Sequence, residues 1–345
     1  MLKDIKSLTL EELISDFEKI GLKKYKAEQT FKWLSKNIKS FDEMSDLSKE
    51  LRSILSEKYK ITRARIVKRL VSSDGTIKFA LELEDSSLIE SVLMKYKFGY
   101  SICVSTQVGC KMRCKFCANS SLSFSRNLFP SEIISQIQEI SSSESINISN
   151  ITLMGVGEPF DNYDNVIKFI KIVTSHKGMN IGMRRISVST CGLSNRIIDF
   201  ANEKMSATLS VSLHSVKNNV RNEIMPINRA HNLEELKKAC KYYNDISNKR
   251  ISFEYIMLKN INDSKNDAEL LSKFLKGLIY HVNLIPANYI ENSNLQASPN
   301  EKVHIFARHL MSLGVNVTVR RTLGNDINAS CGQLRATILK KTGGL

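Results

Sequence analysis

The chain has 345 residues, of which 42% are hydrophobic and 25% charged, a composition typical of a folded globular protein. It has no run of about 20 apolar residues and no apolar stretch at its start, so the sequence predicts neither a membrane-spanning nor a secreted protein. Seven unevenly spaced cysteines do not suit a secreted disulfide framework. We therefore expect a cytoplasmic protein with reduced thiols.

The net charge is +15, from 50 Lys and Arg against 35 Asp and Glu. Residues 23–69 alone hold 14 Lys and Arg against 6 Asp and Glu, with aromatic residues between them. Contacts between such a surface and phosphates release counterions, so the excess favours a polyanionic partner. A generally basic, solvated surface is the alternative that charge alone leaves open.

Residues 1–60 are predicted to form a small helical, basic accessory domain. Thr9 and Glu12 have the spacing of a capping box, and apolar residues follow at helical intervals until Gly21. Further helices are expected over residues 27–37 and 48–59. A domain of this kind can bind RNA or serve only as a packing unit.

Residues 61–100 are predicted to be a β-hairpin extension. Strands are expected over residues 67–71 and 76–81, joined by a turn at Asp74-Gly75, and a third strand over 89–94. A strand over 102–105 then leads into a loop rich in cysteine.

Residues 101–322 are predicted to be an α/β core with a parallel sheet, because apolar strands alternate there with helical segments. The expected strands are 151–154, 185–189, 207–212, 251–256, 281–285 and 316–320. The expected helices are 130–140, 164–175, 195–201, 232–243, 267–276 and 300–313. This alternation suits a barrel or an open doubly wound sheet, and in barrels the chemistry gathers at the carboxyl ends of the strands.

The cysteine loop reads Cys110-Lys-Met-Arg-Cys114-Lys-Phe-Cys117. Three closely spaced thiolates without a nearby fourth can hold a [4Fe–4S] cluster and leave one iron open. That spacing is typical of radical S-adenosylmethionine (SAM) enzymes, which use a partial (β/α)6 barrel and in which SAM chelates the open iron. A zinc site is less suited, since no second Cys pair or His is close in sequence.

Seven further stretches, in order along the chain, resemble the RlmN and Cfr family of radical SAM RNA adenine methyltransferases. They begin at Ser105-Thr-Gln-Val-Gly-Cys110 and Gly155-Val-Gly-Glu-Pro159, and continue with Arg184-Arg-Ile-Ser-Val-Ser-Thr-Cys-Gly192, Ser210-Val-Ser-Leu-His214, Met225-Pro-Ile-Asn228, Val282-Asn-Leu-Ile-Pro286 and Asp326-Ile-Asn-Ala-Ser-Cys-Gly-Gln333. The resemblance covers nearly the whole chain. It departs at Ala118-Asn-Ser120, where the family often has Ala-Thr-Gly.

The resemblance implies a mechanism that consumes two SAM molecules per turnover. Cys331, in the C-terminal segment 323–345, matches the cysteine that carries the methyl group as S-methylcysteine. Cys103 matches the cysteine that resolves the protein–RNA link through a transient disulfide, and Glu90 matches the proton acceptor. Read without the family, Cys103 could be a core thiol and Glu90 an edge-strand charge.

For SAM, the resemblance implies contacts from Gly157, Glu158, Ser189, Ser212, Leu213, His214 and Asn288. His214 taken alone would be expected to be a packed histidine, and Cys191 and Cys240 match no role. Pro159 favours methylation of carbon 2 of adenine in 23S rRNA, and in some tRNAs, over the carbon-8 methylation of Cfr. A radical SAM protein that only binds RNA, or one that modifies peptides, is the alternative of a different class. The expected partners are RNA and an electron donor such as flavodoxin or ferredoxin, with a monomeric enzyme and no membrane.

Overall fold

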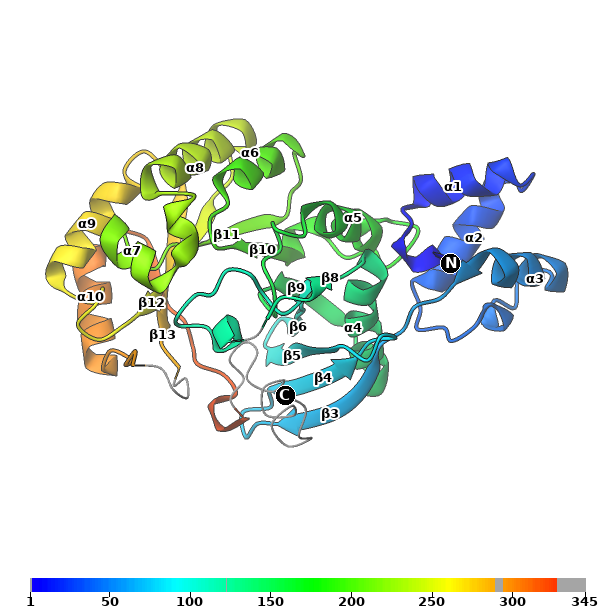
Figure 1. Ribbon diagram of the computed structural model, residues 1–345, viewed down its shortest axis with the longest axis horizontal. Helices are drawn as coiled ribbons and strands as arrows, with labels where there is room; N and C mark the ends of the chain where they lie inside the picture. The colour runs from blue at the N-terminus through cyan, green and yellow to red at the C-terminus, as the bar shows by residue number, and fades with distance from the viewer. Residues whose placement is uncertain (1, 122, 289–293, 328–345) are drawn as a thin grey trace.

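A computed structural model describes residues 2–121, 123–288 and 294–327 of the chain. Within these ranges ten strands form one curved sheet, in the order β14-β13-β12-β11-β10-β9-β6-β5-β4-β3 (Figure 1). Helices cover the outer face of the sheet, and the N-terminal helices lie at one end. The predicted α/β architecture is confirmed, with β14 and β3 as open edges instead of a closed barrel.

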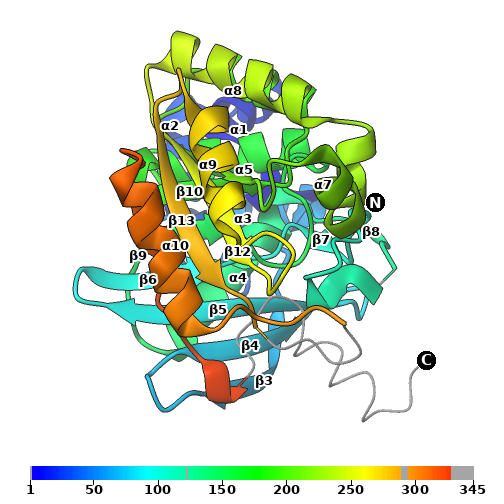
Figure 2. The ribbon, with the colours of Figure 1, turned by 90° about the vertical axis from the view of Figure 1, so that its left-hand side faces the viewer.

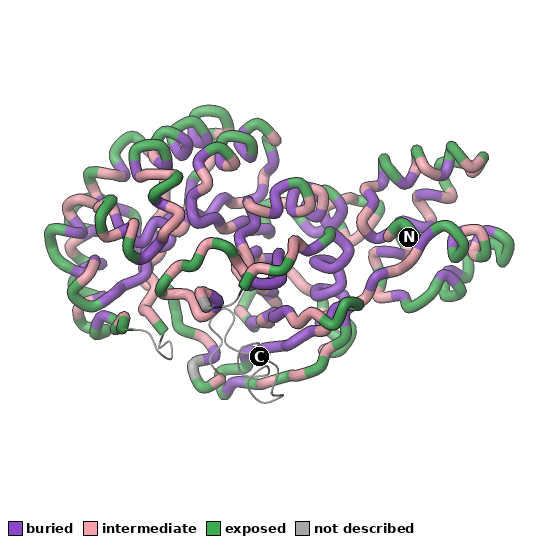
Figure 3. The backbone as a smooth tube through the Cα atoms, viewed as in Figure 1, coloured by how far each residue is buried: buried purple, intermediate pink, exposed green. Residues whose placement is uncertain are grey.

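The larger part of the sheet is parallel and follows the predicted alternation of strands and helices. Its strands are β6 (Gly99–Cys103), β9 (Ile148–Leu153), β10 (Ile186–Thr190), β11 (Thr208–Ser212), β12 (Ile251–Met257), β13 (Tyr280–Pro286) and β14 (Val317–Val319). The helices between them are α4 (Pro130–Ser143), α5 (Tyr163–Thr174), α6 (Ser194–Asn202), α7 (Asn218–Ile224), α8 (Leu233–Ser247), α9 (Lys265–Leu275) and α10 (Asn300–Ser312). Helices cover these strands on one face, and many of their residues are buried while nearly all the others are half-buried (Figure 3).

Three antiparallel strands extend the sheet beyond β6. They are β3 (Arg65–Val71), β4 (Ile77–Glu82) and β5 (Leu88–Tyr96). The predicted turn between β3 and β4 is confirmed, and Gly75 adopts a φ of 85° that suits glycine. In the register of the extension Ala80 faces Glu90, and Val92 faces both Lys78 and Cys103. One row across β4, β5 and β6 therefore contains Lys78, Val92 and Cys103.

The N-terminal region contains α1 (Leu10–Lys19), α2 (Lys24–Leu34) and α3 (Lys49–Lys58), with a short strand pair of β1 (Lys3–Asp4) and β2 (Tyr59–Lys60). The predicted capping box is present: Thr9 caps α1 and the Glu12 carboxylate accepts from the Thr9 amide. Helix α2 starts three residues before the predicted start, because its first turn is mostly lysine and carries no apolar period. The region joins the core where Gln138 of α4 donates to the carbonyl of Leu34 at 2.8 Å.

The helix α7 is absent from the predicted elements. It has seven residues, too few for an apolar period to be read against a polar sequence. Tertiary hydrogen bonds from Arg221 stabilise it, as described below. Among the described residues, no helix combines the length and apolar character needed to cross a membrane.

Candidate active site

A cavity of about 350 Å³ opens at the carboxyl ends of the parallel strands, where β5 and β6 meet the cysteine loop. Most of the predicted site residues that the structure describes line it. They are Glu90, Cys103, Cys110, Cys114, Cys117, Gly157, Glu158, Ser189, Ser212, His214 and Asn288. Leu213 does not line the cavity, because its side chain is fully buried behind it. Cys331 lies outside the described residues.

The cysteine loop runs between the short strands β7 (Gln107–Val108) and β8 (Arg126–Asn127). Gly109 turns the chain into it with a φ of 75°, and a Cβ there would lie 2.0 Å from the carbonyl oxygen of Ser123. The amide of Lys115 donates to the carbonyl of Ile224, at the end of α7, at 2.9 Å. The loop is therefore held at its entrance and at its centre.

The three loop thiols have a chemistry that fits an iron–sulfur cluster. Burial raises the pKa of Cys110 to about 11 and that of Cys114 well above its usual value, so a coordinating metal is needed to keep them as thiolates. No three His, Cys, Asp or Glu side chains among the described residues converge on a single metal ion.

Glu158 sits in a tight loop after β9 and is almost completely buried. Its carboxylate accepts from the amides of Phe160 and Cys191 at 3.0 and 2.8 Å. Gly157 before it has a φ of 108°, and a Cβ there would lie 2.6 Å from the side chain of Gln107. Burial raises the pKa of Glu158 despite these amide bonds. Position 157 requires a glycine, because the loop approaches Gln107 of β7 so closely.

His214 is a neutral, packed side chain at the end of β11. Its Nδ1 accepts from the amide of Ile256 at 3.1 Å. Its ring packs edge-to-face with that of Phe116 in the cysteine loop, with ring centroids 4.5 Å apart. Burial, together with the nearby Arg221 guanidinium, lowers the pKa of His214 to about 3. Because Nδ1 accepts a hydrogen bond, the neutral ring carries its own hydrogen on Nε2.

Arg221 of α7 is fully buried, and sequence reasoning missed it. Its guanidinium donates to the carbonyls of Cys191, Ser212 and Leu213 and to the side chain of Asn228, at 2.7 to 3.2 Å. It therefore joins the carboxyl ends of β10 and β11 to the helix that holds the cysteine loop. No periodic signal marks it, because its partners are backbone carbonyls far apart in sequence.

Glu90 and Cys103 lie on neighbouring strands beside the loop of Glu158. The hydroxyl of Ser105 donates to the Glu90 carbonyl at 2.6 Å and accepts from the Val156 amide at 3.0 Å. The carboxylate of Glu90 and the side chain of Lys78 are both buried in the cavity wall. The hairpin register thus places the predicted acid, the predicted thiol and an unpredicted lysine on one surface.

A second carboxylate in the cavity, Glu254 of β12, was also missed by sequence reasoning. Its Oε1 accepts from Ser210, Ser252 and Asn283 at 2.8 to 3.1 Å. Its Oε2 is buried and has no hydrogen-bond partner among the described residues. A buried carboxylate oxygen needs a donor, so this atom fits the hydroxyl or amino group of a bound ligand such as SAM.

The chain reaches the cavity again through residues 320–323, which follow β14 and line its mouth. Beyond them two contacts fasten the chain to the turn between β3 and β4 (Figure 2). The amide of Gly324 donates to Asp74 at 2.7 Å, and Asp326 accepts from the amide of Ser73 at 2.9 Å and from the hydroxyl of Ser72. Burial acts to raise the pKa of Asp74, but hydrogen bonds from Gly324, Thr76 and Ser72 outweigh it and lower that pKa to about 2. We call this pair of contacts the Asp74–Asp326 clasp.

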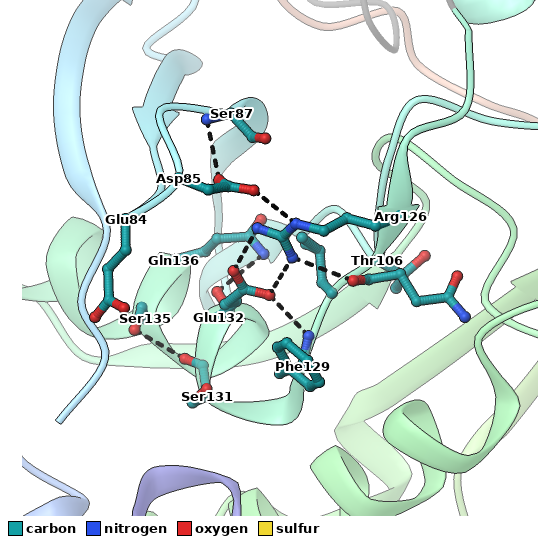
Figure 4. Close-up of polar contacts among 12 residues, drawn as sticks. Glu84, Asp85, Ser87, Thr106, Arg126, Phe129, Ser131, Glu132, Ser135 and Gln136 are labelled. Atoms are coloured by element: carbon teal, nitrogen blue, oxygen red, sulfur yellow. Dashed lines mark hydrogen bonds and ion pairs between the residues drawn. The ribbon is translucent and has the colours of Figure 1, made fainter. Parts of the chain in front are cut away.

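An ionic network supports the wall behind the cysteine loop (Figure 4). Arg126, where the loop ends, donates to Asp85 of the β4–β5 turn at 2.7 Å and to both carboxylate oxygens of Glu132 on α4 at 2.8 Å. Glu132 also accepts from the amide of Phe129, which caps the helix. The network joins the loop, the hairpin extension and the helix layer.

Comparison with known proteins first defines the class. The radical SAM superfamily matches residues 104–271, and the N-terminal domain of ribosomal RNA large subunit methyltransferases matches residues 3–61. The fold is that of a radical SAM methyltransferase from Sphaerobacter thermophilus, with a TM-score of 0.89 and 36% identity over 96% of this chain and 98% of that one. The chain is a radical SAM protein, a class that implies a 4Fe–4S cluster and SAM.

Full-length relatives then define the family. The chain is 49% identical over 98% of its length to a protein of Caldanaerobacter subterraneus, and 46% identical over 98% to one of Clostridium novyi, with 99% of each relative covered. Both relatives are named probable dual-specificity RNA methyltransferase RlmN. The chain belongs to the RlmN family of radical SAM RNA methyltransferases, as its motifs predict.

Proposed function

We propose that this protein methylates carbon 2 of an adenine in 23S rRNA, and in some tRNAs, through an S-methylcysteine at Cys331. One observation supports this most strongly. The cluster thiols, Glu90 and Cys103 line a single cavity, and residues 320–323, which lead to Cys331, line its mouth. A protein that only binds RNA needs no such gathering of thiols.

Cys110, Cys114 and Cys117 would hold one cluster per chain, and SAM would lie between it and the strand ends. Gly157, Glu158, Ser189, Ser212, His214 and Asn288 are the proposed SAM contacts, with Leu213 supporting them from behind. When bound, the cluster and SAM supply a hydrogen-abstracting radical and the methyl group. The buried Oε2 of Glu254 would complete the polar lining of the proposed SAM site.

The remaining steps belong to the chain's own residues. Glu90, on the wall beside Cys103, would take the proton from carbon 2 of the adenine. In the protein–RNA link, the former S-methyl carbon of Cys331 is bonded both to its sulfur and to carbon 2 of the adenine. The Cys103 thiolate would attack the sulfur of Cys331, and the bond from that sulfur to the bridging carbon would break. Its electron pair stays on the bridging carbon, which takes up a proton and becomes the methyl group, while the two cysteines form a disulfide.

The domain division follows from these roles. We propose that residues 1–60 bind RNA, that 61–100 form the substrate side of the cavity, that 101–322 form the radical SAM core and that 323–345 carry Cys331. We further propose a cytoplasmic monomer reduced by a flavodoxin or ferredoxin, since a large folded RNA has to approach the open mouth of the cavity.

Mass spectrometry of nucleosides tests the proposal. Reconstituted protein, SAM and a reductant are incubated without oxygen with unmodified 23S rRNA fragments and tRNA. The expected product is 2-methyladenosine. A product of 8-methyladenosine would assign a Cfr-like activity instead, and the absence of any methylated adenine would refute RNA methylation.

A further inference from the structure

The turn between β5 and β6 presents a pair of stacked aromatic rings to solvent. Tyr96 and Phe98 lie with ring centroids 4.9 Å apart and planes 6° from parallel. Phe98 is 66% exposed, although a phenylalanine gains most by burial. The proposed methylation of adenine gives neither ring a role, so the exposure of this aromatic pair needs a separate explanation.

The ring pair is continuous with the cavity. Alternate residues of β5 line the cavity wall: Glu90, Val92, Met94 and Tyr96. Glu90 is buried at the inner end of this row, and Tyr96 stands at its outer end. The six residue steps from Glu90 to Tyr96 span about 20 Å along the strand. One face of β5 therefore connects the proposed proton acceptor to the exposed rings.

The surroundings of the rings are basic. Lys95 and Lys97 flank Tyr96 and are both exposed, and residues 91–109 contain no Asp or Glu. Across the mouth of the cavity, Arg320 and Arg321 are also exposed. This combination of open aromatic faces and cations is what single-stranded nucleic acid binds, through base stacking and phosphate contacts.

Contacts with the sheet constrain the turn. Tyr96 pairs with Gly99 across a two-residue turn at Lys97 and Phe98. Gly99 has a φ of 121°, and a Cβ there would lie 2.3 Å from the hydroxyl oxygen of Ser149, so the glycine allows the turn to rest on β9. A fixed pair of rings loses little freedom when a base stacks on it, which favours binding.

We propose that Tyr96 and Phe98, flanked by Lys95 and Lys97, form a stacking platform for an unpaired nucleobase of the RNA substrate, a few nucleotides from the adenine in the cavity. The inference rests on the proposed function and deepens it. RNA suits this surface better than an electron-transfer protein, because the rings continue the wall that leads to Glu90, on the substrate side of the cavity.

The test compares Phe98→Ala with Phe129→Ala. Phe129 is a matched control, since it is 58% exposed but does not line the cavity. RNA affinity is measured by fluorescence polarisation with a labelled unmodified tRNA, and methylation with dithionite as the reductant. Phe98→Ala is expected to weaken RNA binding about tenfold and to raise KM with little change in kcat. Phe98→Trp should restore binding, and Phe129→Ala should match the wild type.

A second measurement separates this inference from the proposed function. Methylation of Cys331 in the absence of RNA, followed by mass spectrometry of the intact protein, should be unchanged in Phe98→Ala. Wild-type affinity in Phe98→Ala would overturn the platform while leaving the proposed function intact. So would a defect that appears with flavodoxin and vanishes with dithionite, which would assign the rings to the electron donor. A wild-type protein that methylates Cys331 but neither binds nor modifies RNA would overturn both.

Discussion

The parallel and antiparallel parts of the sheet contribute different chemistry to one cavity. The parallel strands end in the loops of Cys110–Cys117, Glu158 and His214, which suit a cluster and SAM. The antiparallel strands β4 and β5 bring Lys78, Glu90 and the exposed rings, and their neighbouring turn holds the chain that leads to Cys331. The comparison teaches that the proposed radical machinery and the proposed substrate-side groups lie in different parts of the sheet, so we expect that each can be perturbed without the other.

The largest effect is expected on the parallel side. Cys114→Ser should remove one ligand of the proposed cluster, with loss of most iron and of the brown visible absorbance after anaerobic reconstitution. Cys240→Ala is the control, because Cys240 is a fully buried core thiol outside the cavity, and it should keep its iron. A full iron complement in Cys114→Ser would contradict the ligand assignment.

The second largest effect is expected at β6, the strand where the parallel and antiparallel parts of the sheet meet. Cys103→Ala should allow at most one reaction per chain and leave the protein covalently attached to RNA, because no thiol remains to break the link to Cys331. A denaturing gel with labelled RNA would show a shifted band. Iron content should be that of the wild type. Recovery of only free RNA and free protein would refute the resolving role.

A smaller effect is expected from Glu254→Gln, again on the parallel side. Replacing a buried carboxylate that hydrogen-bonds a ligand with a neutral amide of the same shape should weaken SAM binding about tenfold. Equilibrium dialysis with labelled SAM measures this, and RNA affinity should not change. Glu301→Gln, on the exposed first turn of α10, is the matched control. Unchanged SAM affinity would show that Oε2 faces another group.

The smallest effect is expected from the clasp on the antiparallel side. Asp74→Asn should slow methylation of Cys331 by about three- to tenfold, measured by intact-protein mass, because the chain before it is less firmly held. Asp164→Asn, an exposed site on α5, is the control. Adding Asp326→Asn to this variant should slow methylation of Cys331 little further, since the two carboxylates fasten the same stretch of chain to the same turn.

The pKa of Asp74 predicts the pH dependence of this clasp. Hydrogen bonds lower the pKa from 3.8 to about 2, so the ionised clasp is favoured above pH 3.8 and is lost as the pH falls through about 2. The ratio of wild-type to Asp74→Asn rates should therefore be constant between about pH 6 and 9. A ratio that changes across that range would mean that another group governs the contact.

How far the sequence predicted the site depends on the kind of residue. The cysteine loop and the Gly-Glu loop were found because their residues are adjacent in sequence and their spacing carries the chemistry. Lys78, Arg221 and Glu254 were missed, because their contacts join strands far apart in sequence and a charged residue in a strand or short helix usually faces solvent. The stacked rings were missed for another reason: Tyr96 and Phe98 are close in sequence, but only the conformation of the turn brings their rings face to face.

By itself, the sequence determined the succession of strands and helices, the family and the identity of the thiols, because apolar periods and ordered motifs are local properties of the chain. Only the tertiary structure decided which side chains share the cavity. The β4–β5–β6 register set Lys78 and Glu90 beside Cys103, and the buried Arg221 joined two strand ends to the cysteine loop. Such contacts depend on long-range backbone hydrogen bonds and burial, which no stretch of sequence specifies alone.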